Sequence, residues 1–139
     1  MSRATIRVAG EVVGDMGAGL LALVGVADGD EAEHAEAMAR KLVRLRVFED
    51  AEGRMNRDLL ETGGTLGIVS QFTLLGDTAK GRRPFFGAAA APERAEPLVE
   101  AVVVAARREG APVVTGRFGA RMQLELANEG PVTILLDCP

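Results

Sequence analysis

Residues 19–26 form an unbroken apolar run, Gly-Leu-Leu-Ala-Leu-Val-Gly-Val. A short run without charged residues is typical of a central strand that is buried inside a sheet. Residues 65–74 follow the pair Gly63-Gly64 and form a second, largely apolar run. We assign this run as another central strand, so the sequence predicts a sheet as the framework of the fold.

Two helices are predicted between and after these runs. Apolar residues recur at helical spacing over residues 31–46, and Asp30 with Glu33 three positions later resembles a capping box at a helix start. A second apolar stripe continues as far as a Gly-Ala-Pro stop signal. Pro97 interrupts this stripe, so either the second helix begins near Glu96 or its first turn is irregular.

Alternating patterns predict further strands at both ends of the chain. Residues 5–13 alternate around a turn and suggest a hairpin, and two more strands are expected at 122–127 and 132–136. The order β-β-α-β-α-β-β predicts an α+β fold with a mixed, partly closed sheet, or barrel, and two main helices. No linker or repeat divides the chain, so we expect one domain over residues 1–139.

The composition excludes several kinds of site. The chain has one histidine, His34, and one cysteine, Cys138. A zinc site normally takes about three or four ligands, mainly from these two residue types, and a nucleophilic triad needs a histidine base. We therefore expect no metal and no cofactor. His34 lies among glutamates and is expected on the surface.

The charge balance and the chain ends suggest where the protein works. The 139 residues carry 16 Lys+Arg and 20 Asp+Glu, a formal charge of −4. This balance disfavours a general nucleic-acid binder but leaves room for a local basic patch. No signal peptide and no membrane span is visible, and a lone cysteine fits a reducing compartment, so a cytoplasmic location is expected.

The second apolar run contains a polar cluster made of Ser70, Gln71 and Thr73. Buried hydroxyl and amide groups cost about 1–3 kcal/mol each unless they are hydrogen-bonded. One interpretation is a strand end that emerges into solvent. The other is a strand end that presents hydroxyl, amide and backbone N–H groups to a ligand.

The segment Asn128-Glu129-Gly130-Pro131 interrupts the last two predicted strands. Proline cannot donate to a β-ladder, so a turn is indicated. From the residues alone a trans turn is favoured, because only about 5–6% of X-Pro bonds in folded proteins are cis. A cis Gly130-Pro131 bond would instead fix two carbonyl oxygens in one direction and could act as a steric gauge.

A basic loop, Lys80-Gly81-Arg82-Arg83-Pro84-Phe85-Phe86, lies in the long irregular stretch of residues 76–91. The simpler interpretation is a solvated loop whose phenylalanines pack on the core. The functional alternative is an RNA-facing patch, in which Lys80, Arg82 and Arg83 meet phosphates and the aromatic rings stack on bases.

These motifs together resemble one known family. Ser70-Gln71-Phe72-Thr73-Leu74 and Asn128-Glu129-Gly130-Pro131-Val132-Thr133 resemble the two signature motifs of the D-aminoacyl-tRNA deacylases. The resemblance extends from Ser2 to Leu136. The other matching segments, in the family's order, are Gly17-Ala18-Gly19-Leu20-Leu21, Arg46-Val47-Phe48, Gly53-Arg54-Met55-Asn56, Arg83-Pro84 and residues 115–123.

The resemblance implies a homodimer that hydrolyses the ester between a D-amino acid and the terminal adenosine of tRNA. It also implies hydrolysis of glycine mischarged on tRNA. A cis Gly130-Pro131 element would reach from one subunit into the pocket of the other and exclude L-amino acids, mounted on the segment that starts at Asn128. Ser70, Gln71, Phe72 and Thr73 would form the catalytic pocket floor. Phe118, Met122 and Asn128 would bind the substrate, and the first two match family positions near the terminal adenosine or the Gly-Pro element.

The mechanism implied is hydrolysis assisted by the RNA itself. The 2′-hydroxyl of the terminal ribose would help water attack, while backbone N–H groups near Phe72 and Thr73, or the amide of Gln71, would stabilise the oxyanion. Thr73 is a candidate nucleophile on chemical grounds, but no base stands ready to activate it. We therefore expect no acyl-Thr73 intermediate.

Two other function classes remain open at this stage. The first is a non-catalytic dimeric domain of the same fold that binds tRNA or protein, and the second is an unrelated metal-free hydrolase. Family members generally begin with one more strand, carrying an Arg, before the segment that matches residues 2–5. That strand is missing from this sequence. Three explanations are open: the start codon is misassigned, the strand is lost, or another residue such as Arg3 or Arg7 replaces its Arg.

Overall fold

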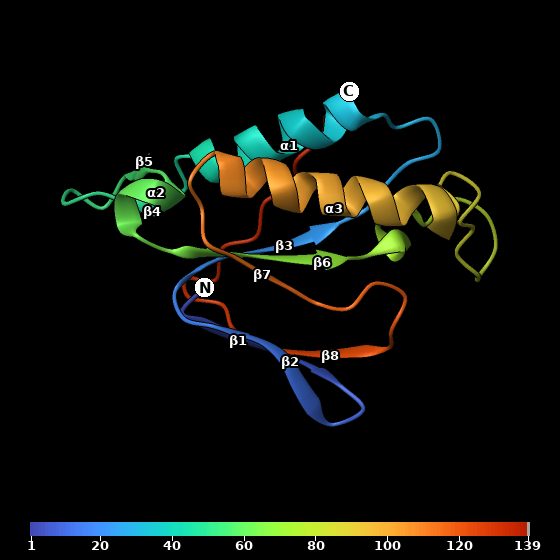
Figure 1. The fold of residues 1–139 in the computed structure, drawn as a ribbon, viewed down its shortest axis with the longest axis horizontal. Helices are drawn as coiled ribbons and strands as arrows, with labels where there is room; N and C mark the ends of the chain where they lie inside the picture. The colour runs from blue at the N-terminus through green and yellow to red at the C-terminus, as the bar shows by residue number, and fades with distance from the viewer. Residues whose placement is uncertain (139) are drawn as a thin grey trace.

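The computed structural model describes residues 1–138 and consists of two three-stranded sheets, a small two-stranded sheet and helices (Figure 1). The strands are β1 Arg3–Val8, β2 Glu11–Met16, β3 Gly19–Val24, β4 Phe48–Glu49, β5 Met55–Arg57, β6 Thr65–Ser70, β7 Val113–Thr115 and β8 Met122–Ala127. The helices are α1 Ala32–Arg44, α2 Leu59–Thr62 and α3 Pro92–Arg108, with a 3-10 turn, η1, at Phe72–Leu75.

The first sheet is antiparallel and has the order β2-β1-β8. The predicted hairpin is confirmed, because β1 pairs with β2 around a turn at Ala9 and Gly10. Both turn residues have positive φ, 51° and 82°, which is the backbone that a tight hairpin turn requires.

The second sheet contains both apolar runs and is parallel, in the order β3-β6-β7. Gly19 pairs with Thr65 at one end of the strands, and Val24 pairs with Ser70 at the other end. In Figure 1, α1 and α3 lie together on one side of this sheet, and the antiparallel sheet lies on the other side. The expected buried central strand is confirmed for β6, which has a neighbour on each side and is buried along most of its length. It is wrong for β3, which is an edge strand with mostly half-buried side chains and a Leu23 that is 42% exposed.

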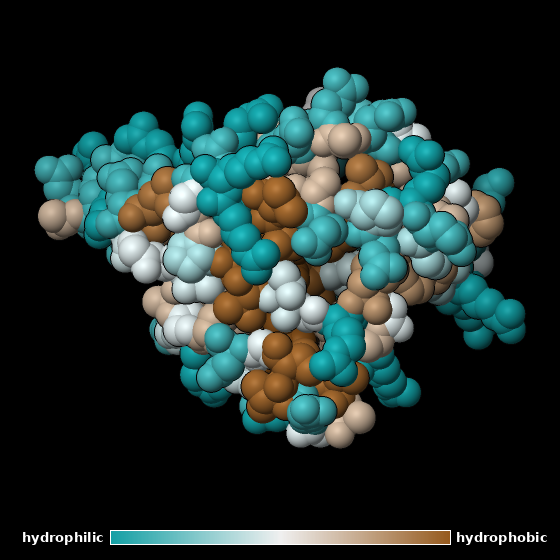
Figure 2. Space-filling model, in the orientation of Figure 1, coloured by the Kyte–Doolittle hydropathy of each residue, from teal (hydrophilic) through white to brown (hydrophobic). Residues whose placement is uncertain are grey.

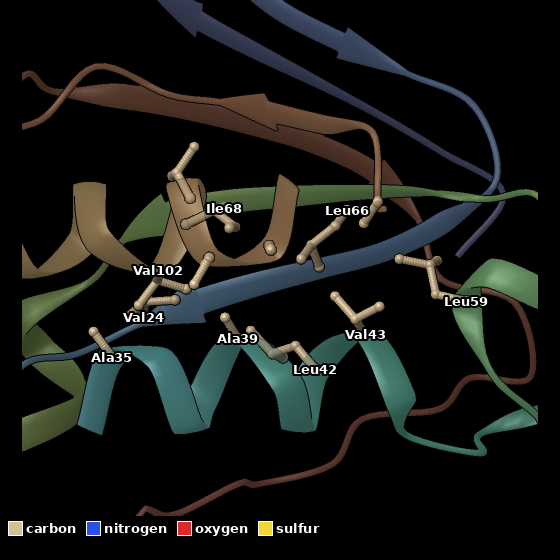
Figure 3. Packing of buried hydrophobic residues seen from close by; sticks show 13 residues of the cluster. Val24, Ala35, Ala39, Leu42, Val43, Leu59, Leu66, Ile68 and Val102 are labelled. Carbon is tan, nitrogen blue, oxygen red and sulfur yellow. The ribbon is translucent and has the colours of Figure 1, made fainter. Parts of the chain in front are cut away.

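The main core lies between the parallel sheet and the two long helices. Figure 3 shows Ala35, Ala39, Leu42 and Val43 of α1 pointing toward β3 and β6. Ala39 and Val43 have no exposed surface at all, and the buried face of α3 adds small and β-branched side chains. Alanines at the helix interface allow α1 and α3 to pack closely against each other.

Several sequence-based boundaries need correction. The strand expected over 65–74 stops at Ser70, and the chain turns into η1. The strand expected over 132–136 does not form within one chain. The second helix begins at Pro92 rather than near Glu96, with Pro97 inside it. A short helix, α2, was not predicted.

The N-cap of the first helix lies one residue later than the predicted cap, Asp30. Glu31 is the N-cap residue, and its N–H donates to Nδ1 of His34 at 2.9 Å. The carboxylate of Asp30 instead accepts the N–H of Ala27 at 2.8 Å. His34 therefore has a local structural contact at the start of α1.

The α+β class is confirmed, whereas the single mixed sheet is wrong, because the strands divide into one antiparallel and one parallel sheet. Closure into a barrel stays a prediction. None of the helices in residues 1–138 combines the length and the apolar character needed to cross a membrane.

Candidate active site

The first motif lies at the carboxyl end of β6. The N–H of Gln71 donates to the carbonyl of Val24 at 2.8 Å, which ties the motif to the end of β3. Gly25 follows Val24 and leaves room for η1: a Cβ at Gly25 would lie 2.6 Å from Cδ2 of Leu75 and 3.2 Å from the carbonyl oxygen of Gln71. The missing side chain of Gly25 therefore allows η1 to pack over the end of the sheet.

Within this motif the side chains of Gln71 and Thr73 are hydrogen-bonded. The amide nitrogen of Gln71 donates to Oγ1 of Thr73. Ser70 and Gln71 are half-buried, while Phe72 and Thr73 are exposed. The first N–H groups of a helix have no acceptor within it, so those of Phe72 and Thr73 are free of helical bonding. The strand thus ends at Ser70 and the chain becomes exposed after it, which agrees with both interpretations of the polar cluster.

Phe118 and Met122 lie at the same end of the parallel sheet. The N–H of Gly116, which follows β7, donates to the carbonyl of Ile68 at 3.3 Å. The turn beyond it is held by Met122, whose sulfur accepts the N–H of Arg117 at 3.4 Å. Phe118 and Met122 are both half-buried. The structure therefore places these two predicted residues and the polar cluster on one end of the fold.

The basic loop lies in the irregular segment that begins directly after η1. Asp77 and Phe85 close it through two backbone hydrogen bonds of 2.7 and 2.8 Å. Lys80, Arg82 and Arg83, between these two residues, are all exposed. Phe86 packs edge-on against Phe72, with ring centroids 5.1 Å apart, so the loop is joined to η1.

The second motif lies at the opposite end. The N–H of Ser2 donates to the carbonyl of Ala127, and Met1 exchanges backbone hydrogen bonds with Gly19, so the segment after β8 lies beside the start of β3. Ser70 lies beside the end of β3. A six-residue strand is about 17–20 Å long, so one chain does not bring the two motifs together (Figure 1).

Asn128 shapes this second motif. Its amide nitrogen donates to Oγ1 of Thr133 at 3.2 Å, and its amide oxygen accepts the N–H of Val132 at 3.4 Å. The Gly130-Pro131 bond is cis, so the trans turn favoured by the residues alone is wrong, and the geometry implied by the resemblance is present. Gly130 has φ of 120°, and both residues are exposed.

A groove of about 670 Å³ runs along β3, between this strand and the chain after the second motif. Asn128 lines one end of the groove, and His34 and Cys138 line other parts of it. Among the described residues that line it, none belongs to the Ser70–Thr73 segment. Figure 2 shows apolar residues gathered in the middle of one face with hydrophilic residues around them. Leu74 of the first motif lines the groove, whereas the predicted pocket floor, Ser70–Thr73, lies outside it.

Charged groups lie on the surface in the described part of the chain, where no charged side chain is buried. The N–H groups of Arg54 and Glu52 donate to the Asp50 carboxylate in the turn between β4 and β5 and lower its pKa below the ordinary 3.8. Within residues 1–138, no group of three or more metal-ligating side chains comes together.

Two basic residues at the site end were missed by the sequence analysis. Arg117 and Arg121 are exposed on the turn that carries Phe118. Arg121 also lines a small pocket of about 250 Å³ with Arg7 and Met122. Their position in the sequence, on either side of Phe118, was the signal that could have placed them at the same end of the fold.

The comparisons with known proteins agree with the two motifs. The family model described as D-Tyr-tRNA(Tyr) deacylase matches residues 1–137. The chain belongs to this deacylase family. The sequence-based identification of the family, and with it of a family of hydrolases, is therefore confirmed.

Relatives of this deacylase family match nearly the whole chain. A D-aminoacyl-tRNA deacylase of Anaeromyxobacter dehalogenans (strain 2CP-C) is 56% identical over 137 residues, covering 99% of this chain and 92% of the relative. A D-aminoacyl-tRNA deacylase of Chloroflexus aurantiacus (strain ATCC 29364 / DSM 637 / Y-400-fl) is 55% identical over 134 residues, covering 96% of this chain and 84% of the relative.

Two solved structures share the deacylase fold. One is titled c-Myc DNA Unwinding Element Binding Protein; it is 36% identical, with a TM-score of 0.93, and the match covers 99% of this chain and 94% of that one. The other is titled a probable eukaryotic D-amino acid tRNA deacylase; it is 22% identical, with a TM-score of 0.73, and the match covers 93% and 90% of the two chains.

Proposed function

We propose that this protein hydrolyses the ester bond of D-aminoacyl-tRNA and so removes D-amino acids from tRNA before translation uses them. The observation that carries this proposal is the family match over residues 1–137, which contains both motifs. The curated relatives over 50% identical are named for this activity. A role in translation also favours the cytoplasm as the place of action.

The working unit is a homodimer in this proposal. Ser70–Thr73 and Gly130-Pro131 lie at opposite ends of β3 in one chain, so a second copy must supply the Gly-Pro element to any site that uses both. The exposed apolar residues Val132, Ile134 and Leu135, next to this element, supply surface that a second subunit would cover. Leu135 is 88% exposed in the single chain.

Chiral selection comes from the carbonyl oxygens of Gly130 and Pro131. Placed against the α-carbon of the bound amino acid, they leave no room on the side where an L side chain would project. A D side chain points away from them, and glycine has no side chain to exclude. The proposed substrates therefore include glycine mischarged on tRNA.

The chemical step relies on the substrate's own hydroxyl. Oγ1 of Thr73 already accepts a hydrogen bond from Gln71, and no base among the described residues is hydrogen-bonded to it. We therefore assign attack to water, assisted by the 2′-hydroxyl of the terminal ribose. The N–H groups of Phe72 and Thr73 and the amide of Gln71 would stabilise the oxyanion, while Ser70 shapes the floor.

The tRNA end is held by the surface around this floor. Lys80, Arg82 and Arg83 on the adjoining loop would meet phosphates. Phe118 and Met122, on the neighbouring turn, would contact the terminal adenosine. Their common position at one end of the parallel sheet supports this arrangement.

The second candidate is a non-catalytic domain of the same fold that binds nucleic acid or protein. It is favoured by one observation, the close likeness to a structure that its title describes as a DNA-element binding protein. A deacylation assay with matched D- and L-aminoacyl-tRNA, with and without a chelator, separates the two. D-selective, chelator-resistant turnover supports the deacylase, whereas tRNA binding without turnover supports the binding domain.

A further inference from the structure

The ring of Phe85 is exposed on a fixed backbone. It is 69% exposed, although the N–H and the carbonyl of Phe85 are both hydrogen-bonded to Asp77. These two bonds close the loop that carries the cations. The point from which the ring projects is therefore fixed relative to η1, which ends two residues before Asp77.

Gly87 supports this ring from one side. A Cβ at Gly87 would lie 2.4 Å from both Cε1 and Cζ of Phe85, closer than real contacts allow. The ring thus rests against the chain at Gly87, and any larger residue there would displace it. Most of the remaining ring surface faces solvent, since Phe85 is 69% exposed.

The loop combines this ring with three exposed cations, Lys80, Arg82 and Arg83. Proteins that hold single-stranded nucleic acid use the same combination, because cations neutralise the backbone phosphates and an aromatic ring stacks on a base. A ring buried between other side chains would lack a free surface for stacking. Phe86 is half-buried and packs edge-on against Phe72, so part of its ring is already covered, whereas Phe85 is exposed.

The loop lies within reach of the site. Asp77 follows Thr73 by four residues, which span at most about 14 Å when fully extended. The N–H of Gly76 donates to the carbonyl of Thr73 at 3.0 Å, so the actual path is a turn. A short unpaired RNA segment that ends at Thr73 would pass the base of the loop.

We infer that Phe85 stacks on an unpaired base of the tRNA 3′ end, just before the terminal adenosine, while Lys80, Arg82 and Arg83 hold the neighbouring phosphates. This inference rests on the proposed function. The contact is remote from the amino acid, so it adds affinity for the RNA without distinguishing D from L substrates.

The test measures the affinity of the protein for an uncharged acceptor-stem minihelix with its unpaired 3′ end and for one trimmed to a blunt end. Stacked aromatic residues contribute affinity that alanine removes, here an expected loss of about fivefold to tenfold for Phe85→Ala. Phe85→Trp keeps a ring and should bind as the wild type does. Phe85→Leu should behave like Phe85→Ala. Val12→Ala, at another exposed apolar side chain, is the control and should change nothing.

On the blunt minihelix all variants should bind equally weakly. Unchanged affinity in Phe85→Ala, or full rescue by leucine, would overturn the inference, and so would a loss of dimer in Phe85→Ala, since a second copy would then cover the ring. Because the RNA is uncharged, the result does not depend on turnover. Ring-dependent RNA binding by a protein that leaves D-aminoacyl-tRNA intact would support this contact and contradict the proposed function.

Discussion

The side-chain amide of Gln71 donates a hydrogen bond to the hydroxyl oxygen of Thr73. The pair links the residue at the end of β6 to the residue inside η1. A hydroxyl that accepts from an amide, with no histidine or carboxylate bonded to it among the described residues, is a poor nucleophile. The arrangement is suited to orienting a substrate rather than to attacking it.

Thr73→Ala should therefore retain most of the deacylase activity. Loss of an activated nucleophile would lower the rate by several orders of magnitude, whereas loss of a positioning hydroxyl should cost about tenfold or less. The measurement is single-turnover deacylation of D-aminoacyl-tRNA. Near-complete inactivity of a variant whose circular dichroism matches the wild type would contradict the assignment of Thr73 to positioning alone.

Gly130→Ala should weaken chiral selection. Gly130 has φ of 120°, and a Cβ there would lie 2.9 Å from Cγ2 of Val132. The added methyl group must shift the backbone that carries the selecting carbonyls, so the D-to-L ratio of deacylation rates should fall about tenfold or more.

A matched control exists for this substitution at Gly53→Ala. Gly53 also has positive φ, 78°, but no atom lies within 4 Å of a Cβ there, and it is in the turn between β4 and β5. It should cost about 1 kcal/mol of stability and leave the rate ratio unchanged. An equal change in both variants would mean that the effect is general destabilisation.

Replacing Lys80, Arg82 and Arg83 with alanine should weaken tRNA binding equally for D- and L-charged forms. Each phosphate contact contributes about 0.7–0.9 to the slope of log affinity against log salt. The triple variant should therefore lose about 2–3 from that slope. A salt dependence identical to the wild type would place the tRNA elsewhere on the surface.

Gly25→Ala should impair activity more than stability. The added Cβ would press on Leu75 and on the carbonyl of Gln71, so η1 has to move away from the end of β3. Gly17→Ala, where no atom lies within 4 Å, is the control. Urea unfolding and D-aminoacyl-tRNA turnover should be compared. A Gly25→Ala variant with full turnover would show that the close packing of η1 on Gly25 does not position the catalytic segment.

Asp50 gives a pH dependence of known sign. Its pKa in the folded state is held below 3.8 by backbone N–H donors, so the ionised form stabilises the fold. This contribution is complete above pH 3.8 and is lost as pH falls through the folded pKa. Asp50→Asn should flatten that part of the stability curve. The measurement is the free energy of unfolding of both proteins at a series of acid pH values. An identical dependence on pH in Asp50→Asn and the wild type would show that the charge does not stabilise the turn.

The sequence predicted the elements whose pattern is local. Strands form within both apolar runs, at Gly19–Val24 and Thr65–Ser70, and the helical spacing of the predicted first helix matches α1 at Ala32–Arg44. The bend after Ser70 and the absence of a strand after Pro131 could not be predicted in this way, because residues far away in the sequence decide them. Gly25 makes room for η1, and nothing in residues 65–74 themselves reports that space.

The candidate site also has one part that local sequence predicts and one part that it does not. Ser70, Gln71, Phe72 and Thr73 are adjacent in sequence, so their common location could be predicted. The distance between this cluster and Gly130-Pro131 could not, because it depends on which end of β3 each motif reaches. The start of the second helix was predicted too late, because Pro92 stands at the first helical position, where proline is favoured, and this signal was not used.

Chiral selection is measured by the ratio of single-turnover rates on the same tRNA charged with the D- and the L-form of one amino acid. The D-form should be hydrolysed at least about a hundredfold faster, because the carbonyls of Gly130 and Pro131 block only the L side chain. Equal rates for the two forms, or no hydrolysis of either by the folded protein, would contradict this prediction.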